Sequence, residues 1–308
     1  MTAVHVVTGA GPVGSTVALQ LAEAGHQVRL LTRSGSGPEH PLIERRTVDA
    51  SRPDQLTAAL DGAVVVHHCI HGSAYDVRAW RAELPAAEKV VLEAAGRVGA
   101  VVVFPESLYA YGPVAGPMTE DLPRNASTGK LGVRRDLLAQ REASDTPTVS
   151  IAASDFYGPR VLMAHAGDRM IPTVLAGRTM RVIGSLDQPH SWTYVPDLAA
   201  AMIKAAAAPE LWNSFLHAPT APPVTQRQLV KQVAATAGVP VPKTSALPSG
   251  VLKAFGVVAR SMRELAETSY MFDRPFVLDS SASEARLGLS PTPLETGLKE
   301  TVSWWQSR

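Results

Sequence analysis

Short apolar runs alternate with longer helical segments through the first half of the chain. The runs that predict β-strands cover residues 4–8, 27–32, 46–49, 63–67, 100–104 and 148–152. Helices are predicted between most of them, at residues 13–24, 53–60, 85–98 and 129–144. Several strands are almost continuously apolar, as in 64–66 and 101–103, which is typical of strands buried on both faces. The alternation predicts an α/β fold with a doubly wound parallel sheet.

The pattern changes after about residue 155, where proline and glycine become frequent. Helices are still expected at residues 195–208, 225–237 and 293–306. We therefore expect a sheet domain over residues 1–154, to which residues 192–216 return. Residues 155–191 and 217–308 are expected to form a smaller cap on the carboxyl edge of the sheet.

A glycine-rich loop joins the first predicted strand to the first predicted helix. Gly9, Gly11 and Gly14 have the Gly-x-Gly-x-x-Gly spacing, in which the glycines permit the tight turn, the approach of a pyrophosphate and close helix packing. Pro12 and Val13 begin the helix, whose exposed amides attract phosphate. We expect these five residues to bind a dinucleotide in a Rossmann-like domain. The alternative is a strand–turn–helix that only needs flexible glycines.

The second predicted strand ends in Arg33, between Thr32 and Ser34. An acidic residue near this position binds the ribose hydroxyls of NAD, whereas arginine pairs with the 2′-phosphate of NADP. We therefore expect NADP rather than NAD, unless Arg33 is only a solvated loop residue. Asp49, at the end of the third predicted strand, is expected either to contact the adenine region of the cofactor or to stabilise the N-terminus of the helix near Pro53.

Composition and charge narrow the range of partners. Apolar residues make up 45% and charged residues 19%, and 29 basic against 28 acidic side chains give a net charge of +1. This balance does not suggest nucleic acid or an anionic membrane as a partner. No apolar stretch reaches the length of about 20 residues needed to span a membrane. The single cysteine, Cys69, excludes an intrachain disulfide.

Two further absences bear on location and metal binding. No spacing of His, Asp or Glu predicts a metal site. The chain starts directly with a strand pattern, without a leader segment. We expect a cytoplasmic protein with a small-molecule substrate.

Several later segments, in order and spacing, resemble the NAD(P)-dependent epimerase/dehydratase family, the extended or atypical branch of the short-chain dehydrogenases/reductases. The segments are VVVHHC at 64–69, VFPESLYAYG at 103–112, DFYGP at 155–159, TYVPDLA at 193–199 and LGLSP at 287–291. The resemblance covers nearly the whole chain. It implies that Cys69 and Ile70 lie beside the cofactor, that the cap binds substrate, and that the protein is a homodimer.

The family's chemistry uses a tyrosine as general acid/base, a lysine four residues later and a serine that orients the substrate oxygen. Ser107 matches the serine, and Lys130 matches the lysine, which holds the nicotinamide ribose and lowers the pKa of the tyrosine. Ala126 stands where the tyrosine is expected. The usual proton donor is therefore missing.

A replacement acid has to come from another loop at the carboxyl edge of the sheet. Tyr109, close to Ser107, is the first candidate, and Tyr157, after the sixth strand, is the second. Glu106, His71 and Tyr75 lie on loops at the same edge. The alternative for each aromatic residue is that it packs beneath the cofactor.

Two positions bear on the substrate. Family members that use nucleotide sugars usually have an asparagine and an arginine that hold the diphosphate, where this chain has Asp155 and His190. A carboxylate repels a diphosphate, and a neutral histidine is no bidentate clamp. Apolar and aromatic residues of the cap suit a smaller substrate, unless they form the cap's own core: Met163, Ile171, Trp192, Tyr270, Met271, Phe272 and Phe276.

The first hypothesis is an NADP-dependent oxidoreductase that acts on a small carbonyl or alcohol. The second is a non-catalytic NADP-binding sensor similar to the NmrA-like regulators, which the missing tyrosine favours and the retained Ser107 and Lys130 oppose. The third is an epimerase or dehydratase that recycles its cofactor.

Overall fold

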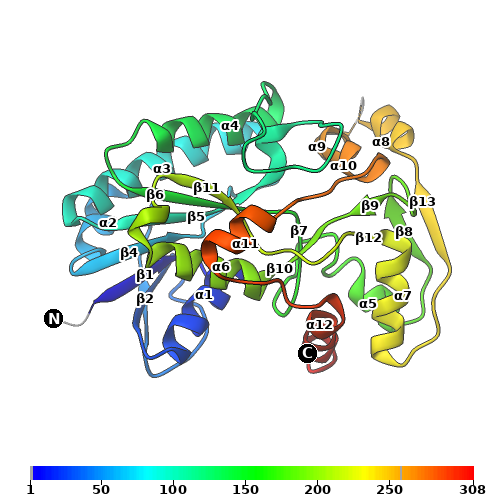
Figure 1. Ribbon diagram of the computed structural model, residues 1–308, viewed down its shortest axis with the longest axis horizontal. Coiled ribbons are helices and arrows are strands. Elements are labelled where there is room, and N and C mark those ends of the chain that lie inside the picture. Colours follow the sequence, from blue (N-terminus) through cyan, green and yellow to red (C-terminus); the bar gives the residue numbers. More distant parts are fainter. Residues whose placement is uncertain (1–2, 257–258) are drawn as a thin grey trace.

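The computed structural model describes residues 3–256 and 259–308. Its centre is a parallel seven-stranded sheet in the order β11-β6-β5-β4-β1-β2-β3 (Figure 1). The strands are β1 (Val4–Thr8), β2 (Gln27–Thr32), β3 (Ile43–Thr47), β4 (Ala63–His68), β5 (Val101–Ser107), β6 (Thr148–Ala153) and β11 (Ser214–His217). The order reverses beside β1, as in a doubly wound sheet, so the predicted Rossmann-like α/β fold is confirmed.

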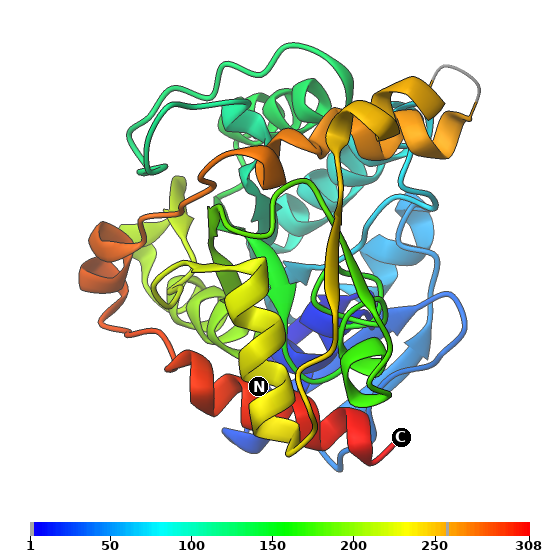
Figure 2. The same ribbon diagram turned by 90° about the vertical axis from the view of Figure 1, so that its right-hand side faces the viewer.

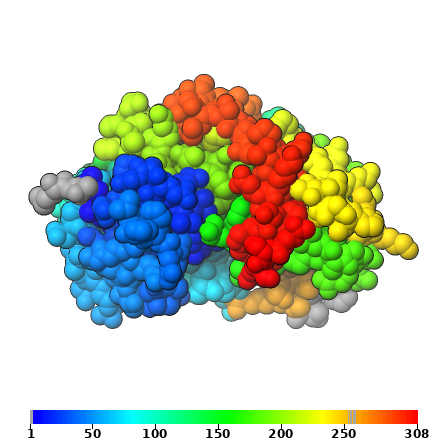
Figure 3. All heavy atoms as spheres, turned by 90° about the horizontal axis from the view of Figure 1, so that it is seen from below, coloured from blue at the N-terminus to red at the C-terminus, as the bar shows by residue number. Residues whose placement is uncertain are grey.

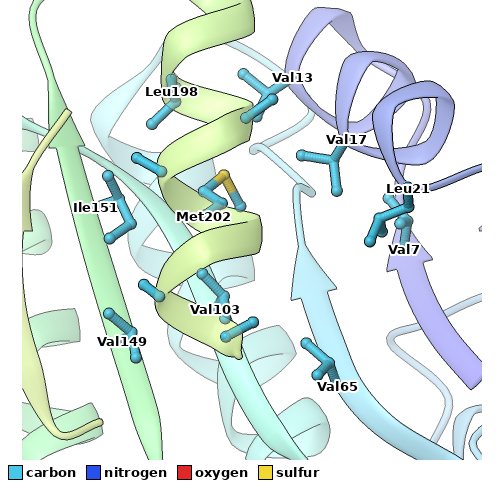
Figure 4. Packing of buried hydrophobic residues seen from close by; sticks show 14 of the residues in the cluster. Val7, Val13, Val17, Leu21, Val65, Val103, Val149, Ile151, Leu198 and Met202 are labelled. Carbon is cyan, nitrogen blue, oxygen red and sulfur yellow. The ribbon is translucent and has the colours of Figure 1, made fainter. Parts of the chain in front are cut away.

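Helices cover both faces of this sheet. One face carries α1 (Pro12–Glu23) and α6 (Val195–Ala206), and the other carries α2 (Pro53–Ala59), α3 (Val77–Val98) and α4 (Gly129–Glu142). Neighbouring strand residues alternate between the two cores. Figure 4 shows the first core, where Leu198 and Met202 of α6 pack with Val13 and Val17 of α1 above the strands.

Two predicted boundaries in the sheet domain were wrong. The third strand was placed at 46–49 but runs from Ile43 to Thr47, because this edge strand is mostly polar and exposed and lacks an apolar run. The third helix was expected to start at Pro85 but begins at Val77, with Pro85 inside it. Its true start is capped by Asp76, whose carboxylate accepts hydrogen bonds from the amides of Arg78 and Ala79.

The cap is built from short elements (Figure 2). Its strands pair two by two: β7 (Asp155–Tyr157) with β10 (Trp192–Tyr194), β9 (Pro189–His190) with β12 (Val224–Thr225), and β8 (Met180–Ile183) with β13 (Thr244–Leu247). Its helices are α5 (Ile171–Leu175), α7 (Gln226–Ala237), α8 (Ser249–Phe255), α9 (Arg260–Thr268), α10 (Tyr270–Asp273), α11 (Ser281–Leu287) and α12 (Leu294–Gln306). Seen from below, the red C-terminal segment lies between the blue N-terminal part and the yellow cap (Figure 3).

Most apolar residues that suggested a substrate pocket form the core of the cap instead. Those buried there are Ile171, Trp192, Met271, Phe272 and Phe276. Met163, in contrast, is 97% exposed. The segment after residue 217 is not confined to the cap, since Leu287 of α11 is buried in the core between the sheet, α1 and α6.

Candidate cofactor and active site

The glycine loop after β1 has the shape that a dinucleotide diphosphate requires. Gly9 has φ +87°, and a Cβ there would lie 3.0 Å from the carbonyl oxygen of Cys69. A Cβ on Gly14 would lie only 2.0 Å from the oxygen of Gly9, so this glycine lets α1 approach the loop. A Cβ on Gly11 would meet nothing within 4 Å, which leaves space at the start of α1, where Pro12 and Val13 stand. The loop therefore fits a diphosphate.

Cys69 and Ile70 lie against this loop. The amide of Cys69 donates to the oxygen of Thr8 over 2.9 Å, and its Cβ lies 3.2 Å from the position of a Cβ on Gly14. Ile70 Cγ1 is 3.4 Å from the position of a Cβ on Gly9. Burial raises the pKa of the Cys69 thiol to about 12, so the thiol is neutral and acts in packing.

Arg33 and Asp49 follow neighbouring strands, β2 and β3. Arg33 is exposed. Hydrogen bonds from Ser51 lower the pKa of Asp49, and the charge of Arg33 lowers it further. Asp49 Oδ1 accepts from the amide of Ser51 over 3.0 Å and from its hydroxyl over 2.7 Å, just before α2. Asp49 thus stabilises the turn into α2 and lies within electrostatic range of Arg33.

Ser107 ends β5 and begins a 3₁₀ turn, Leu108–Tyr111. Its hydroxyl donates to Glu106 Oε1 over 3.2 Å and accepts from the amide of Tyr109 over 3.4 Å. The hydroxyl of Tyr109 lies 2.7 Å from that of Tyr75, which comes from the loop after β4 and is itself 3.2 Å from Thr268 Oγ1. The carboxyl ends of two neighbouring strands thus bring a serine and two phenols together.

Both phenols are held in the neutral form. Burial raises the pKa of Tyr109 well above its usual value, and the nearby Tyr75 and Asp155 raise it further. Burial also raises the pKa of Tyr75, although hydrogen bonds from Thr268 and Tyr109 and the charge of Lys130 oppose the rise. Tyr75 remains 38% exposed, so this pair reaches solvent.

Lys130, in the first turn of α4, does not point toward solvent. Its side chain is 0% exposed, and Nζ lies 2.6 Å from Glu264 Oε2, 2.8 Å from Glu267 Oε2 and 2.9 Å from the carbonyl oxygen of Glu264. Burial lowers the pKa of Lys130, but hydrogen bonds to the two carboxylates outweigh it and the net change is upward. The sequence assigned this ammonium to the cofactor ribose, and the structure pairs it with the cap.

Asp155 and His190 form a pair at the base of the cap. Nε2 of His190 lies 2.7 Å from Asp155 Oδ2, and Nδ1 lies 3.2 Å from the carbonyl oxygen of Met271. The imidazole stacks on Phe272 at 4.7 Å between ring centres. Burial raises the pKa of Asp155, but the hydrogen bond from His190 outweighs it and holds the carboxyl ionised. The Asp155 side chain is 22% exposed, so its carboxylate borders the site.

Glu106 is not available as a replacement acid. Its carboxylate is fully buried, 2.9 Å from Arg141 Nη1 and 3.4 Å from Arg134 Nη1, and it accepts from the amide of Ser107 over 2.7 Å. Burial raises the pKa of Glu106, but the two arginines outweigh it and the pKa falls. Glu106 therefore stays ionised and holds the turn at Ser107 in place.

Tyr157 also does not fit the role expected from the sequence. It is 0% exposed, its ring centre lies 5.1 Å from that of Tyr194, and its hydroxyl has no hydrogen-bond partner among the residues that the structure describes. A Cβ on Gly297 of α12 would lie 2.7 Å from this hydroxyl. Tyr157 is thus part of the cap core under α12, and this position contradicts a role as proton donor.

A model of the NAD dependent epimerase/dehydratase family matches residues 5–214. The chain belongs to this family. Membership confirms the resemblance read from the motifs and assigns the chain to a family of NAD-dependent enzymes. No curated protein sequence matches the chain.

Solved structures of the same fold extend over the whole chain. UDP-glucose 4-epimerase from Thermotoga maritima, solved with UDP-glucose, has a TM-score of 0.78 at 20% identity over 99% of each chain. UDP-glucuronic acid 4-epimerase from Bacillus cereus, solved with NAD, has a TM-score of 0.76 at 19% identity over 99% of each chain. The Bordetella bronchiseptica enzyme WbmH, solved with NAD+, has a TM-score of 0.77 at 18% identity over 99% of each chain. These similarities show the shared fold.

The family position of the missing tyrosine is closed in this chain. Ala126 is buried, its amide donates to the carbonyl oxygen of Ala110 over 3.0 Å, and its Cβ lies 3.7 Å from the position of a Cβ on Gly112. Two tyrosines contact the residues that match the family's serine and lysine. Tyr109 makes a backbone contact with Ser107, and the Tyr75 ring lies 4.5 Å from Lys130 Nζ.

Sequence reasoning missed the acidic residues that reach Lys130. Glu264 and Glu267 lie on α9, a helix that was not predicted. The available signal was the spacing of Arg260, Glu264 and Glu267, which places three charged side chains on one helical face. The frequent proline and glycine after residue 155 led to the prediction of an irregular segment there instead of a helix.

Among the residues that the structure describes, no group of three His, Cys, Asp or Glu side chains is arranged to hold a metal ion. Within the same residues, every helix is too short or too polar to cross a membrane.

Proposed function

We propose that this chain is an NADP-dependent oxidoreductase that acts on a small carbonyl or alcohol substrate bound between the sheet and the cap. The observation that carries the proposal is the glycine loop that fits a diphosphate, at the same edge of the sheet as Ser107 and the hydrogen-bonded phenols of Tyr109 and Tyr75. The partly exposed carboxylate of Asp155 favours an uncharged or cationic substrate over an anionic one.

The preference for NADP rests on the end of β2. Arg33 is exposed there, and the hydroxyls of Ser34 and Ser36 lie 2.7 Å apart in the same loop. A guanidinium with neighbouring hydroxyl donors suits a 2′-phosphate, which carries more negative charge than the ribose hydroxyl of NAD. Relatives of the same fold were solved with NAD, so this loop is where we expect the chain to differ from them.

The side chains around Ser107 supply the proton side of the reaction. A dinucleotide held by the glycine loop would supply hydride chemistry at the substrate carbon. The Ser107 hydroxyl, which donates to Glu106 Oε1, would exchange that acceptor for the reacting oxygen when substrate binds. The hydrogen-bonded phenols of Tyr109 and Tyr75, on the loops after β5 and β4, would hold the proton. Both phenols stay neutral, so the pair carries the proton that carbonyl reduction consumes, although burial makes the two phenols weaker acids.

The same charge argues against the substrates of the structural relatives. The Thermotoga maritima epimerase was solved with UDP-glucose, whose diphosphate is anionic. In this chain Asp155 occupies a position where nucleotide-sugar members usually have an asparagine, and His190, its hydrogen-bond partner, stands where they have an arginine. Repulsion between a carboxylate and a diphosphate in a partly buried site is costly.

The test combines cofactor binding with turnover. We expect tight NADPH binding and NADPH consumption with some members of a panel of small aldehydes and ketones. Ser107→Ala should lower kcat/KM by about 100-fold while the NADPH dissociation constant stays within a factor of about three. Ser303→Ala, on the exposed side of α12, is the control and should behave like the wild type.

Three outcomes would contradict the proposal. Full activity of Ser107→Ala would remove Ser107 from the mechanism. Tight NADPH binding without consumption of any carbonyl would favour a sensor. Epimerisation of UDP-glucose would favour the third hypothesis, an epimerase that recycles its cofactor.

A further inference from the structure

One face of α9 is attached to the N-terminal ends of α3 and α4. Arg260 pairs with Asp76, the residue that caps α3. Glu264 Oε2 accepts from the amide of Val77, the first residue of α3, over 3.2 Å. Residues 260, 264 and 267 lie one helical turn apart, so one stripe of α9 makes all of these contacts. Figures 1 and 2 both show α9 on the side of the molecule that carries α4.

The carboxylate of Glu267 occupies the N-terminus of α4. Its Oε1 accepts from the backbone amide of Lys130 over 2.9 Å, and its Oε2 lies 2.8 Å from Lys130 Nζ. Gly129 has φ +58°, and a Cβ there would lie 1.5 Å from Glu267 Oε1. A glycine at this position is therefore required for the carboxylate to enter. The N-terminus of a helix stabilises such a negative charge.

Every hydrogen-bond donor of the Lys130 ammonium has an acceptor on α9. A lysine ammonium has three N–H donors. Its three acceptors are two carboxylate oxygens and one carbonyl oxygen, at 2.6, 2.8 and 2.9 Å, and the ring of Tyr75 covers it at 4.5 Å. In this arrangement no donor remains for a ribose hydroxyl. Lys130 with Glu264 and Glu267 also carries a net charge of −1, which opposes the approach of a dinucleotide.

We propose that Glu264 and Glu267 are positioning residues that act as an intramolecular ligand for Lys130 and compete with the ribose of the dinucleotide for its ammonium. The inference rests on the proposed function, because it requires Lys130 to bind the cofactor once it is released. Dinucleotide binding must then break the contacts between α9 and the N-terminus of α4. The apparent affinity for the cofactor is then the intrinsic affinity multiplied by the fraction of molecules in which Lys130 is released from α9.

The direct test removes the two carboxylate charges. In Glu264→Gln/Glu267→Gln, Lys130 is freed, and we expect the NADPH dissociation constant to fall by about tenfold, a change of about 1.4 kcal/mol. The control is Glu295→Gln, which removes an exposed carboxylate that pairs with Lys299 on α12. This control should leave NADPH binding unchanged.

A triple variant separates competition from a general effect of charge. Lys130→Met/Glu264→Gln/Glu267→Gln removes all three charges together and so leaves no buried charge without a partner. If the gain comes from the freed ammonium, the triple variant binds NADPH no more tightly than the wild type. Equal gains in the double and triple variants would overturn the proposal, as would unchanged or weaker binding in the double variant.

A second measurement needs no substitution and covers the case in which the variants do not fold. Hydrogen exchange of the wild type should become faster in residues 260–268 when NADPH saturates the protein, because α9 loses its contacts. Slower or unchanged exchange there would overturn the proposal even if NADPH binds. Absence of NADPH binding in the wild type and all variants would overturn the proposed function, and this inference with it.

Discussion

The imidazole of His190 donates from Nε2 to Oδ2 of Asp155 over 2.7 Å, although the two residues belong to different short strands of the cap. A buried imidazole thus holds a partly exposed carboxylate. The charge of this carboxylate is measurable through the stability of the fold.

The Asp155 carboxylate should make the protein sensitive to acid. Its pKa is lowered in the folded state by His190, so its contribution to stability is complete above the unfolded pKa of about 3.9 and is lost as the pH falls through the folded pKa. The melting temperature of the wild type should therefore fall more steeply below about pH 4 than that of Asp155→Asn. Thermal unfolding between pH 6 and pH 3 measures this. Asp168→Asn, an exposed control, should keep the wild-type profile, and parallel curves for Asp155→Asn would contradict the prediction.

Two glycines of the cofactor loop should respond differently to the same substitution. Gly14→Ala places a methyl group 2.0 Å from the oxygen of Gly9, so we expect a loss of about 1–3 kcal/mol or more in unfolding free energy. The methyl group of Gly11→Ala meets no atom within 4 Å, and alanine adopts the φ of −69° found at this position. The fold should therefore be unchanged, while the methyl group occupies the space of the diphosphate and weakens NADPH binding by at least about tenfold. Urea unfolding measures the stability of both variants, and titration measures their NADPH affinity. A loss of stability in Gly11→Ala would contradict the prediction.

Arg33 should decide between the two dinucleotides. Arg33→Ala removes the cation expected at the 2′-phosphate, and we expect NADPH to bind about 10–100-fold more weakly while NADH affinity stays the same. Fluorescence titration with both dinucleotides measures the ratio. Arg181→Ala, on the cap strand β8, serves as the arginine control. A similar loss for NADH and NADPH would show that Arg33 does not contact the 2′-phosphate.

The buried network behind Ser107 should be essential for stability. Arg141 is 2% exposed and binds Glu88 through two hydrogen bonds and Glu106 through a third. Arg141→Ala leaves two buried carboxylates without this partner and should cost about 3–5 kcal/mol in urea unfolding. Arg135→Ala breaks an exposed pair with Asp136 and should cost less than about 1 kcal/mol. Equal losses of unfolding free energy in the two variants would show that the buried network stabilises the fold no more than an exposed ion pair does.

The sheet domain could be predicted because its strands are apolar and its loops carry family motifs. β1 and β2 match their predicted residues. Cys69 and Ile70 lie against the glycine loop, and their contact with the cofactor stays a prediction. The edge strand β3 was misplaced because its residues face solvent. The seventh strand, β11, is only four residues long, and its position beside β6 depends on the α6 crossover rather than on its own pattern.

The catalytic end could not be predicted because side chains from distant parts of the chain decide it. The match of Lys130 to the family lysine gives only its position in the sequence. The partners of the Lys130 side chain and amide are Glu264 and Glu267, which lie 134 and 137 residues later. Tyr157 follows a strand at the expected edge, but its backbone direction turns the ring under α12. Motif spacing along the chain contains no information on either orientation.

The attachment of α9 to Lys130 has a consequence for hybrid proteins. In many doubly wound enzymes the cap is a candidate for exchange between relatives, because the cofactor domain folds around its own core. Here a cap from another family member that lacked Glu264 and Glu267 would leave a fully buried ammonium without counter-charges. The space that Gly129 leaves for the Glu267 carboxylate would then be empty. We therefore expect the two parts of this chain to be inherited, and to be engineered, only together.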